Sequence, residues 1–270
     1  MSLRGMAGII TGAAGGIGCA TAKALAARNA NLVLTDVSSS GLEALATDLR
    51  AAGANVRDVV ADITHREDID RVVTAALQTF GRVDILANIA GVSTSPSLCD
   101  ATDQELERVV MVNLLGCART MHAVLPIMKN QRGGSIINVG SVAGEAGVMG
   151  IYSASKFGLR GLSDSVRREV RSFGINVTLI EPGFVRTSFN STMKGRLPGP
   201  EIVADAIVSA VRRPRRRRVV PASYYLPVFL VNAFPGLTDL VFGDARIQDR
   251  LNEDARALRS ATANATRQHE

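Results

Sequence analysis

Two ionisable side chains stand four residues apart in the segment Tyr152-Ser-Ala-Ser-Lys156, which begins a stretch with helical periodicity. At this spacing, both side chains lie on one face of a helix. A phenol with a pKa near about 10 is a poor base at neutral pH, but a neighbouring ammonium group favours the phenolate and lowers that pKa. Such pairs are also common on protein surfaces. The pair therefore predicts proton-transfer chemistry only in combination with a second functional motif.

A glycine-rich turn near the amino terminus could supply that second site. The turn runs Thr11-Gly-Ala-Ala-Gly-Gly-Ile-Gly18 and follows an apolar run at 7–11. Glycines allow a tight turn and a close backbone approach, and the free N–H groups of the following helix bind phosphate oxygens. Glycines also mark ordinary loops, but the position between a strand and a helix favours a dinucleotide site.

Asp36 ends the next apolar run, about twenty residues beyond the turn, where an acidic side chain can accept hydrogen bonds from a ribose diol. Its charge would repel a 2′-phosphate, and no Arg or Lys stands at 13–15 or 37–39 to neutralise one. We therefore expect NAD(H) as the cofactor instead of NADP(H). The alternative is a solvated aspartate in a turn.

Apolar runs alternate with amphipathic stretches through the first 200 residues, which is typical of a parallel sheet covered by helices on both faces. The fold class is therefore α/β, a doubly wound parallel sheet in three αβα layers. Strands are predicted at 7–11, 31–35, 56–60, 85–87, 135–139 and 176–180, with 219–220 as a last strand, and helices near 16–28, 40–52, 66–80, 103–130, 153–173 and 200–213.

The carboxyl-terminal region has a different character. Residues 219–238 carry no charge, which by length suggests a membrane span, but Pro221, Pro227 and Pro235 interrupt the segment. We expect short helices there. The domain prediction is a nucleotide-binding and catalytic domain over 1–222, with a helical extension over 223–270 that belongs to the same domain.

Composition excludes several classes of protein. With 270 residues, 46% hydrophobic and 21% charged, the chain is too apolar to be disordered. Six arginines within 212–218 equal the whole net charge of +6, and with only 4% aromatic residues a nucleic-acid platform is not expected. The arginine run is either a solvated loop or a contact with an anionic membrane surface.

The three cysteines, Cys19, Cys99 and Cys117, are widely spaced, and no Cys or His pair has metal-ligand spacing. We expect free thiols in a reducing compartment and no metal site. The amino terminus does not have the pattern of a signal peptide, so the expected location is cytoplasmic, with membrane association only through Arg212–Arg218.

Taken together, these motifs resemble the short-chain dehydrogenase/reductase family, whose fold is a single Rossmann-like domain. The matching segments, in the family's order, are Thr11–Gly18, Asp62-Ile63, Asn88-Ile89-Ala90-Gly91, Asn113, Ser141, Tyr152 with Lys156, and Pro182-Gly183 with Thr187. They cover residues 6–190 well and thin out beyond 200.

The resemblance implies reversible hydride transfer between a nicotinamide and a secondary alcohol or ketone, in a homo-oligomer that is a dimer or a tetramer. It assigns the catalytic roles to Asn113, Ser141, Tyr152 and Lys156. The implied cofactor-binding residues are Gly12, Gly16, Ile17, Gly18, Asp36, Asp62, Ile63, Asn88, Ala90, Gly91, Tyr152, Lys156, Pro182, Gly183, Val185 and Thr187.

Two positions depart from the family pattern. Ile89 replaces the second asparagine of the family's NNAG element, and the Glu145–Ile151 loop makes the distance from Ser141 to Tyr152 shorter than is usual. The short loop would widen the substrate pocket or displace Ser141. Displacement would favour the alternative function, a non-catalytic NAD-binding sensor or scaffold.

The carboxyl-terminal third supplies the residues expected to close over the substrate. They are mostly apolar and include no charged anchor, so we expect a hydrophobic substrate such as a steroid, an acyl derivative or another lipid-like compound. The alternative is a subunit interface or ordinary core. The residues are Phe184, Phe189, Met193, Leu197, Tyr224, Tyr225, Leu226, Val228, Phe229, Leu230 and Phe234.

Overall fold

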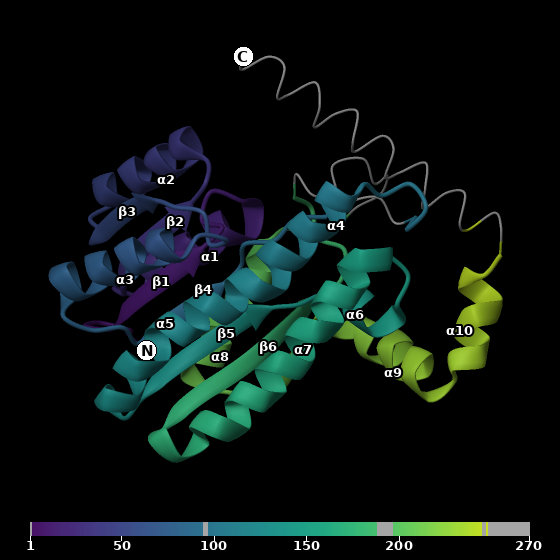
Figure 1. The fold of residues 1–270 in the computed structure, drawn as a ribbon. Helices are drawn as coiled ribbons and strands as arrows, with labels where there is room; N and C mark the ends of the chain where they lie inside the picture. The colour runs from purple at the N-terminus through teal and green to yellow at the C-terminus, as the bar shows by residue number, and fades with distance from the viewer. Residues whose placement is uncertain (1, 94–96, 188–196, 245–246, 248–270) are drawn as a thin grey trace.

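The predicted parallel sheet is confirmed in a computed structural model, which describes residues 2–93, 97–187, 197–244 and 247 (Figure 1). Seven parallel strands lie in the order β3-β2-β1-β4-β5-β6-β7. Their bounds are β1 Ala7–Thr11, β2 Asn31–Asp36, β3 Val56–Val60, β4 Ile85–Asn88, β5 Gly134–Val139, β6 Ile175–Pro182 and β7 Arg217–Val220.

Strand β1 is the point at which the strand order reverses. It pairs with β2 on one side and with β4 on the other, and all five of its residues are buried. In a doubly wound sheet, such a reversal opens a crevice beyond the carboxyl ends of the strands. The loops after β1 and β4 therefore line one crevice.

Helices cover both faces of the sheet, which confirms the three αβα layers (Figure 1). Side chains of α1, α2 and α8 pack in the core on one face, and side chains of α3, α5 and α7 pack on the other. The helices are α1 Gly16–Ala26, α2 Ser39–Ala51, α3 Arg66–Phe80, α5 Cys117–Gln131, α7 Gly150–Val170 and α8 Glu201–Arg212.

The helix predicted near 103–130 is continuous but not uniform. It consists of α4 Asp103–Val110, a π-helical segment η1 Met111–Gly116, and α5. A capping box between Thr102 and Glu105 fixes where it begins. Among the described residues, this helix alone is long and apolar enough to cross a membrane, judged by length and composition. The core helices of globular proteins can meet the same criterion, and α5 packs against β4 and β5.

After α8 and β7 the chain forms the short helices η4 Ala222–Tyr224, α9 Tyr225–Ala233 and α10 Pro235–Phe242, as predicted. The arginine run is not a uniformly solvated patch, because Arg216 pairs with Asp164 and Arg217 pairs with Glu181. Residues 248–270 lie outside the described residues, and the division at residue 222 stays a prediction.

Candidate active site

The glycine turn connects β1 to α1 and depends on two close backbone contacts. Gly12 has φ +66°, and a Cβ there would lie 2.7 Å from the backbone of Ala90. A Cβ on Gly18 would lie 2.0 Å from the carbonyl oxygen of Gly12. No side chain caps the start of α1, so its backbone N–H groups face the turn without competition. The turn therefore fits a phosphate group.

Thr11 ties this turn to the loop after β4. Its Oγ1 accepts hydrogen bonds from the backbone N–H groups of Ile89 at 3.1 Å and Ala90 at 3.2 Å. Because only the backbone of Ile89 takes part, its departure from the family pattern removes no bond at this point. Sequence reasoning included Thr11 only as a member of the glycine motif.

Asn88 lies outside the cavity and braces the sheet, although it was predicted to bind the cofactor. Its side-chain amide donates to Asn138 at 2.9 Å, and its oxygen accepts from the Thr120 hydroxyl at 2.7 Å. Asn138 in turn donates to Ser163 at 2.9 Å. This buried network joins β4 and β5 to α5 and α7.

Asp36 lies where β2 ends and is oriented by two backbone donors. Its carboxylate accepts from the N–H of Ala14 at 2.9 Å and from the N–H of Ser38 at 3.0 Å. The carboxylate is thereby held beside the glycine turn, the position at which a ribose diol would be recognised. Asp62 is fixed similarly, because its carboxylate accepts from the N–H of Thr64 at 2.8 Å.

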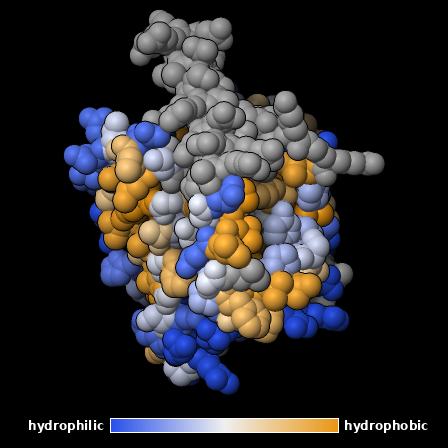
Figure 2. All heavy atoms as spheres, turned by 90° about the vertical axis from the view of Figure 1, so that its right-hand side faces the viewer, coloured by the Kyte–Doolittle hydropathy of each residue, from blue (hydrophilic) through white to orange (hydrophobic). Residues whose placement is uncertain are grey.

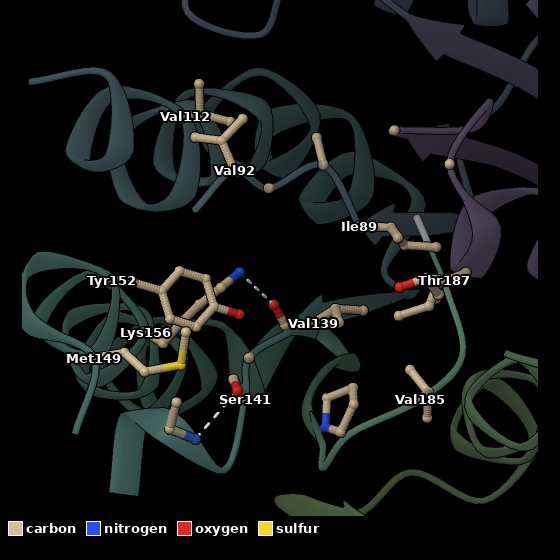
Figure 3. A pocket seen from close by; sticks show the side chains of 18 of the residues that line it. Ile89, Val92, Val112, Val139, Ser141, Met149, Tyr152, Lys156, Val185 and Thr187 are labelled. Carbon is tan, nitrogen blue, oxygen red and sulfur yellow. Dashed lines mark hydrogen bonds between the residues drawn. The ribbon is translucent and has the colours of Figure 1, made fainter. Parts of the chain in front are cut away.

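Ser141 follows β5, and the edge of β6 holds the residues on either side of it. Gly140 N–H donates to Ile180 at 2.7 Å, and Val142 N–H donates to Pro182 at 3.0 Å. The Ser141 side chain hydrogen-bonds the side chain of Tyr152. The short Glu145–Ile151 loop therefore leaves Ser141 beside Tyr152 (Figure 3), and the displacement that would favour a non-catalytic protein is not found.

Tyr152 and Lys156 point from the start of α7 toward the same space (Figure 3). Lys156 Nζ donates to the carbonyl oxygen of Val139 at 3.0 Å and lies 5.8 Å from the centroid of the Tyr152 ring. Both side chains are buried.

Burial dominates the acid–base properties of this pair. It raises the pKa of Tyr152 to about 12, although the hydrogen bond with Ser141 acts in the opposite direction. Burial also lowers the pKa of Lys156. Desolvation of the phenolate is therefore the largest effect on this pKa in the protein without cofactor, and the expected lowering of the phenol pKa by Lys156 stays a prediction.

Asn113 is fully buried within the π-helical segment and does not line the cavity. Its amide donates to Val92 at 2.9 Å and to Ser155 at 3.1 Å, and its oxygen accepts from Val92 N–H at 2.8 Å. Ser155 donates to the carbonyl oxygen of Tyr152 at 2.7 Å. Asn113 thus connects the helix that carries Tyr152 to the loop after β4, and π-helical segments are frequent at functional sites.

One cavity of about 860 Å³ connects the glycine turn to Tyr152. Every predicted site residue except Asn88 and Asn113 lines it. Arg108 and Glu145 also line the cavity, and neither was predicted from the sequence as a site residue. Glu145 carries the only charge in its loop, and that was the one signal that could have drawn attention to it.

The apolar residues expected over the substrate divide into two groups. Phe184, Tyr224 and Val228 line the cavity, and Phe242 joins them. Phe189 and Met193 lie outside the described residues. Figure 2 views the side of the molecule where α9 and α10 lie and shows apolar side chains gathered at its surface. Of the expected residues, Tyr225, Leu226, Phe229, Leu230 and Phe234 have exposed side chains, and Leu197 is half-buried and does not line the cavity.

Among the residues that the structure describes, no group of three His, Cys, Asp or Glu side chains could hold a metal ion. Cys19, Cys99 and Cys117 are free thiols.

Comparisons with known proteins agree with this geometry. The family model described as short chain dehydrogenase matches residues 7–196. The chain is 36% identical over 222 residues to the 3-oxoacyl-(acyl-carrier-protein) reductase FabG of Escherichia coli. The aligned region covers 77% of this chain and 90% of that protein. It is 34% identical over 223 residues to FabG of Thermotoga maritima, with coverage of 77% and 91%.

Solved structures give the same answer. A short-chain dehydrogenase/reductase from Burkholderia phymatum in complex with NAD matches with a TM-score of 0.81 and 28% identity, over 88% of this chain and 96% of that one. Levodione reductase matches with a TM-score of 0.75 and 29% identity, over 80% and 96%. This chain is therefore a member of the short-chain dehydrogenase/reductase family and an oxidoreductase.

Proposed function

We propose that this protein is an NAD-dependent dehydrogenase/reductase that interconverts a secondary alcohol and a ketone. The observation that carries the proposal is the hydrogen bond between Ser141 and Tyr152, within a cavity that also contains the glycine turn. A hydroxyl pair of this kind can bind and protonate one substrate oxygen.

Each residue has a distinct role in the proposed reaction. The Tyr152 hydroxyl donates its proton to the carbonyl oxygen during reduction and takes it back during oxidation. Ser141 donates a hydrogen bond to the same oxygen and orients it. Lys156 binds the ribose next to the nicotinamide and stabilises the phenolate, whereas Asn113 positions the helix that carries Tyr152. A bound nicotinamide would supply or accept the hydride.

The proposed cofactor preference depends on Asp36. Its carboxylate lies beside the glycine turn, and Val37 is the next residue on the cavity wall. A carboxylate accepts hydrogen bonds from ribose hydroxyls and repels a 2′-phosphate. The NAD complex of the Burkholderia phymatum relative supports the same choice.

The proposed substrate is hydrophobic. Its side of the cavity is lined by Val148, Met149, Phe184, Tyr224 and Val228. Two of the relatives are named as a 3-oxoacyl-(acyl-carrier-protein) reductase and as levodione reductase, which supports reduction of a carbonyl group. A homo-oligomer is proposed on the family relationship, and a cytoplasmic location stays a prediction.

The test is a screen of steroid, acyl and aliphatic ketones with NADH, in which loss of NADH absorbance reports turnover. Tyr152→Phe removes the proton donor and should lower the rate by at least about 100-fold while NADH still binds. Calorimetric titration with NADH provides the binding measurement. Retained turnover in Tyr152→Phe would overturn the proposal, and NADH binding without turnover of any ketone would favour a sensor.

A further inference from the structure

A buried group of ionisable side chains lies next to the substrate side of the cavity, which one of its members, Glu145, lines. We call it the Glu145 cluster; it consists of Glu145, Glu181, Arg160 and Arg217. The Glu145 side chain has no exposed surface, and that of Glu181 is 2% exposed, whereas the two arginine side chains are partly exposed. Buried charges are costly unless they are paired, so the positions of these four side chains depend on one another.

Glu145 is the centre of the cluster. Its Oε1 pairs with Arg160 at 2.5 Å and with Arg217 at 3.1 Å. Arg217 also pairs with Glu181, whose carboxyl group shares a hydrogen bond with Glu145. The cluster therefore connects α6 (Ala143–Ala146) to α7, β6 and β7.

The second oxygen of Glu145 reaches the carboxyl-terminal extension. Asn232, at the surface of α9, donates from Nδ2 to Glu145 Oε2 at 2.9 Å and to Val228 at 2.8 Å. This side-chain hydrogen bond joins α9 to the segment that follows Ser141. Both segments line the substrate side, through Val148 and Met149 in the loop and through Val228 and Val231 on α9.

The start of α9 is fixed independently. The Tyr224 ring packs so closely on Gly183 that a Cβ there would lie 2.5 Å from the ring. The Tyr225 hydroxyl accepts from the backbone N–H of Val219 at 3.2 Å. Only the end of α9 depends on Glu145, so changes at Asn232 should move that end and leave the start in place.

We propose that Glu145 is a positioning residue for substrate binding, which holds the loop after Ser141 and the end of α9 together as the two walls of the substrate side. It does not touch the reacting atoms. The proposal rests on the proposed function for its kinetic readout, but the positioning itself can be measured without a substrate.

The experiment compares Asn232→Asp, Asn232→Ala and the wild type. Asn232→Asp is nearly isosteric but replaces the donor by a carboxylate that faces Glu145, with Glu181, Arg160 and Arg217 as the other ionisable groups in the cluster. Because Asn232 lies at the surface, neither variant should prevent folding. Arg216→Gln is the matched control, because it breaks the Arg216–Asp164 ion pair next to β7 and away from the cavity.

Hydrogen–deuterium exchange gives the first readout. We expect residues 143–149 and 228–233 to exchange about tenfold faster in Asn232→Asp, less so in Asn232→Ala, and unchanged in Arg216→Gln. The strand segments 7–11 and 134–139 should not change in any variant.

Steady-state kinetics gives the second readout. For a ketone that the wild type reduces, Asn232→Asp should raise KM about 5- to 20-fold and leave kcat within about twofold, the pattern expected when binding alone is weakened. Unchanged exchange in both segments, or an equal fall in kcat, would overturn the positioning role. Absence of turnover in the wild type would instead contradict the proposed function, and the exchange result would still decide the role of Glu145.

Discussion

Ser141 follows β5, Tyr152 lies in the first turn of α7, and their side chains meet in a hydrogen bond. The loop between them is short for the family, yet the hydroxyl groups still converge. The reason is that β6 fixes the backbone on both sides of Ser141, through Ile180 and Pro182, so the position of Ser141 does not depend on the length of the loop.

Replacing Ser141 should therefore impair the reaction without impairing cofactor binding. Ser141→Ala removes a donor to the substrate oxygen and should lower kcat by about 10- to 1000-fold. Ser141→Thr keeps the hydroxyl group and should retain more activity. The check is kcat at saturating ketone, with NADH affinity measured in parallel, and an unaffected kcat in Ser141→Ala would contradict this role.

The reaction should depend on pH in opposite directions for its two senses. Burial raises the pKa of Tyr152 to about 12 in the protein without cofactor, so the phenol is protonated at neutral pH and ready to donate. Reduction should slow as the pH rises toward the pKa of the phenol, whereas oxidation, which uses the phenolate, should accelerate. Lys156→Met should move the pH profiles of both reduction and oxidation to higher pH. Rates of reduction and oxidation that change with pH in the same direction would exclude Tyr152 as the titrating group.

Gly18 should not tolerate a side chain. A Cβ there would lie 2.0 Å from the carbonyl oxygen of Gly12, so Gly18→Ala must displace the turn. We expect a loss of about 1–3 kcal/mol in the free energy of unfolding and at least about tenfold weaker NADH binding. Gly161→Ala is the matched control, because Gly161 has open space within α7 and alanine favours a helix. Equal NADH affinities in the two variants would contradict the phosphate-binding turn.

Cofactor preference should follow the charge at the end of β2. The double change Asp36→Ser with Val37→Arg removes the carboxylate and introduces a cation that can pair with a 2′-phosphate. The ratio of NADPH to NADH dissociation constants should then fall by about 10- to 100-fold. Calorimetric titration of both cofactors measures it. A wild-type protein that binds NADPH more tightly would show that Asp36 does not set the preference.

Glu181 should make the protein less stable as the pH rises. Burial, together with the neighbouring Glu145 carboxyl group, raises the pKa of Glu181 from 4.5 to about 8. The folded protein therefore holds a proton that the unfolded chain releases above pH 4.5, so this contribution to stability is complete below pH 4.5 and is lost as the pH rises through about 8.

Glu181→Gln mimics the protonated group and should remove that dependence. The variant should gain roughly 1–3 kcal/mol in unfolding free energy relative to wild type between pH 5 and pH 8.5, measured by urea denaturation. Comparing the two proteins at each pH cancels the titration of all other groups. A difference that does not change with pH would show that Glu181 is ionised throughout.

Local sequence patterns determined most of the fold and part of the site. The glycine turn and the Tyr152–Lys156 pair depend on spacing within one segment, and the structure places them as that spacing predicts. The strands could also be predicted from a local pattern, because a buried strand is a short apolar run between turn residues. The π-helical segment around Asn113 interrupts a pattern that reads as one uniform helix.

Tertiary structure decided what depends on contacts between distant segments. Thr11 bonds the loop after β4, Arg217 reaches Glu181 and Glu145, and Asn232 reaches Glu145 only because crossover connections bring these elements together. The pKa of Tyr152 belongs to the same class. Charge spacing along the chain predicts that Lys156 lowers it, but desolvation depends on how completely the fold buries the phenol, and that is a property of packing.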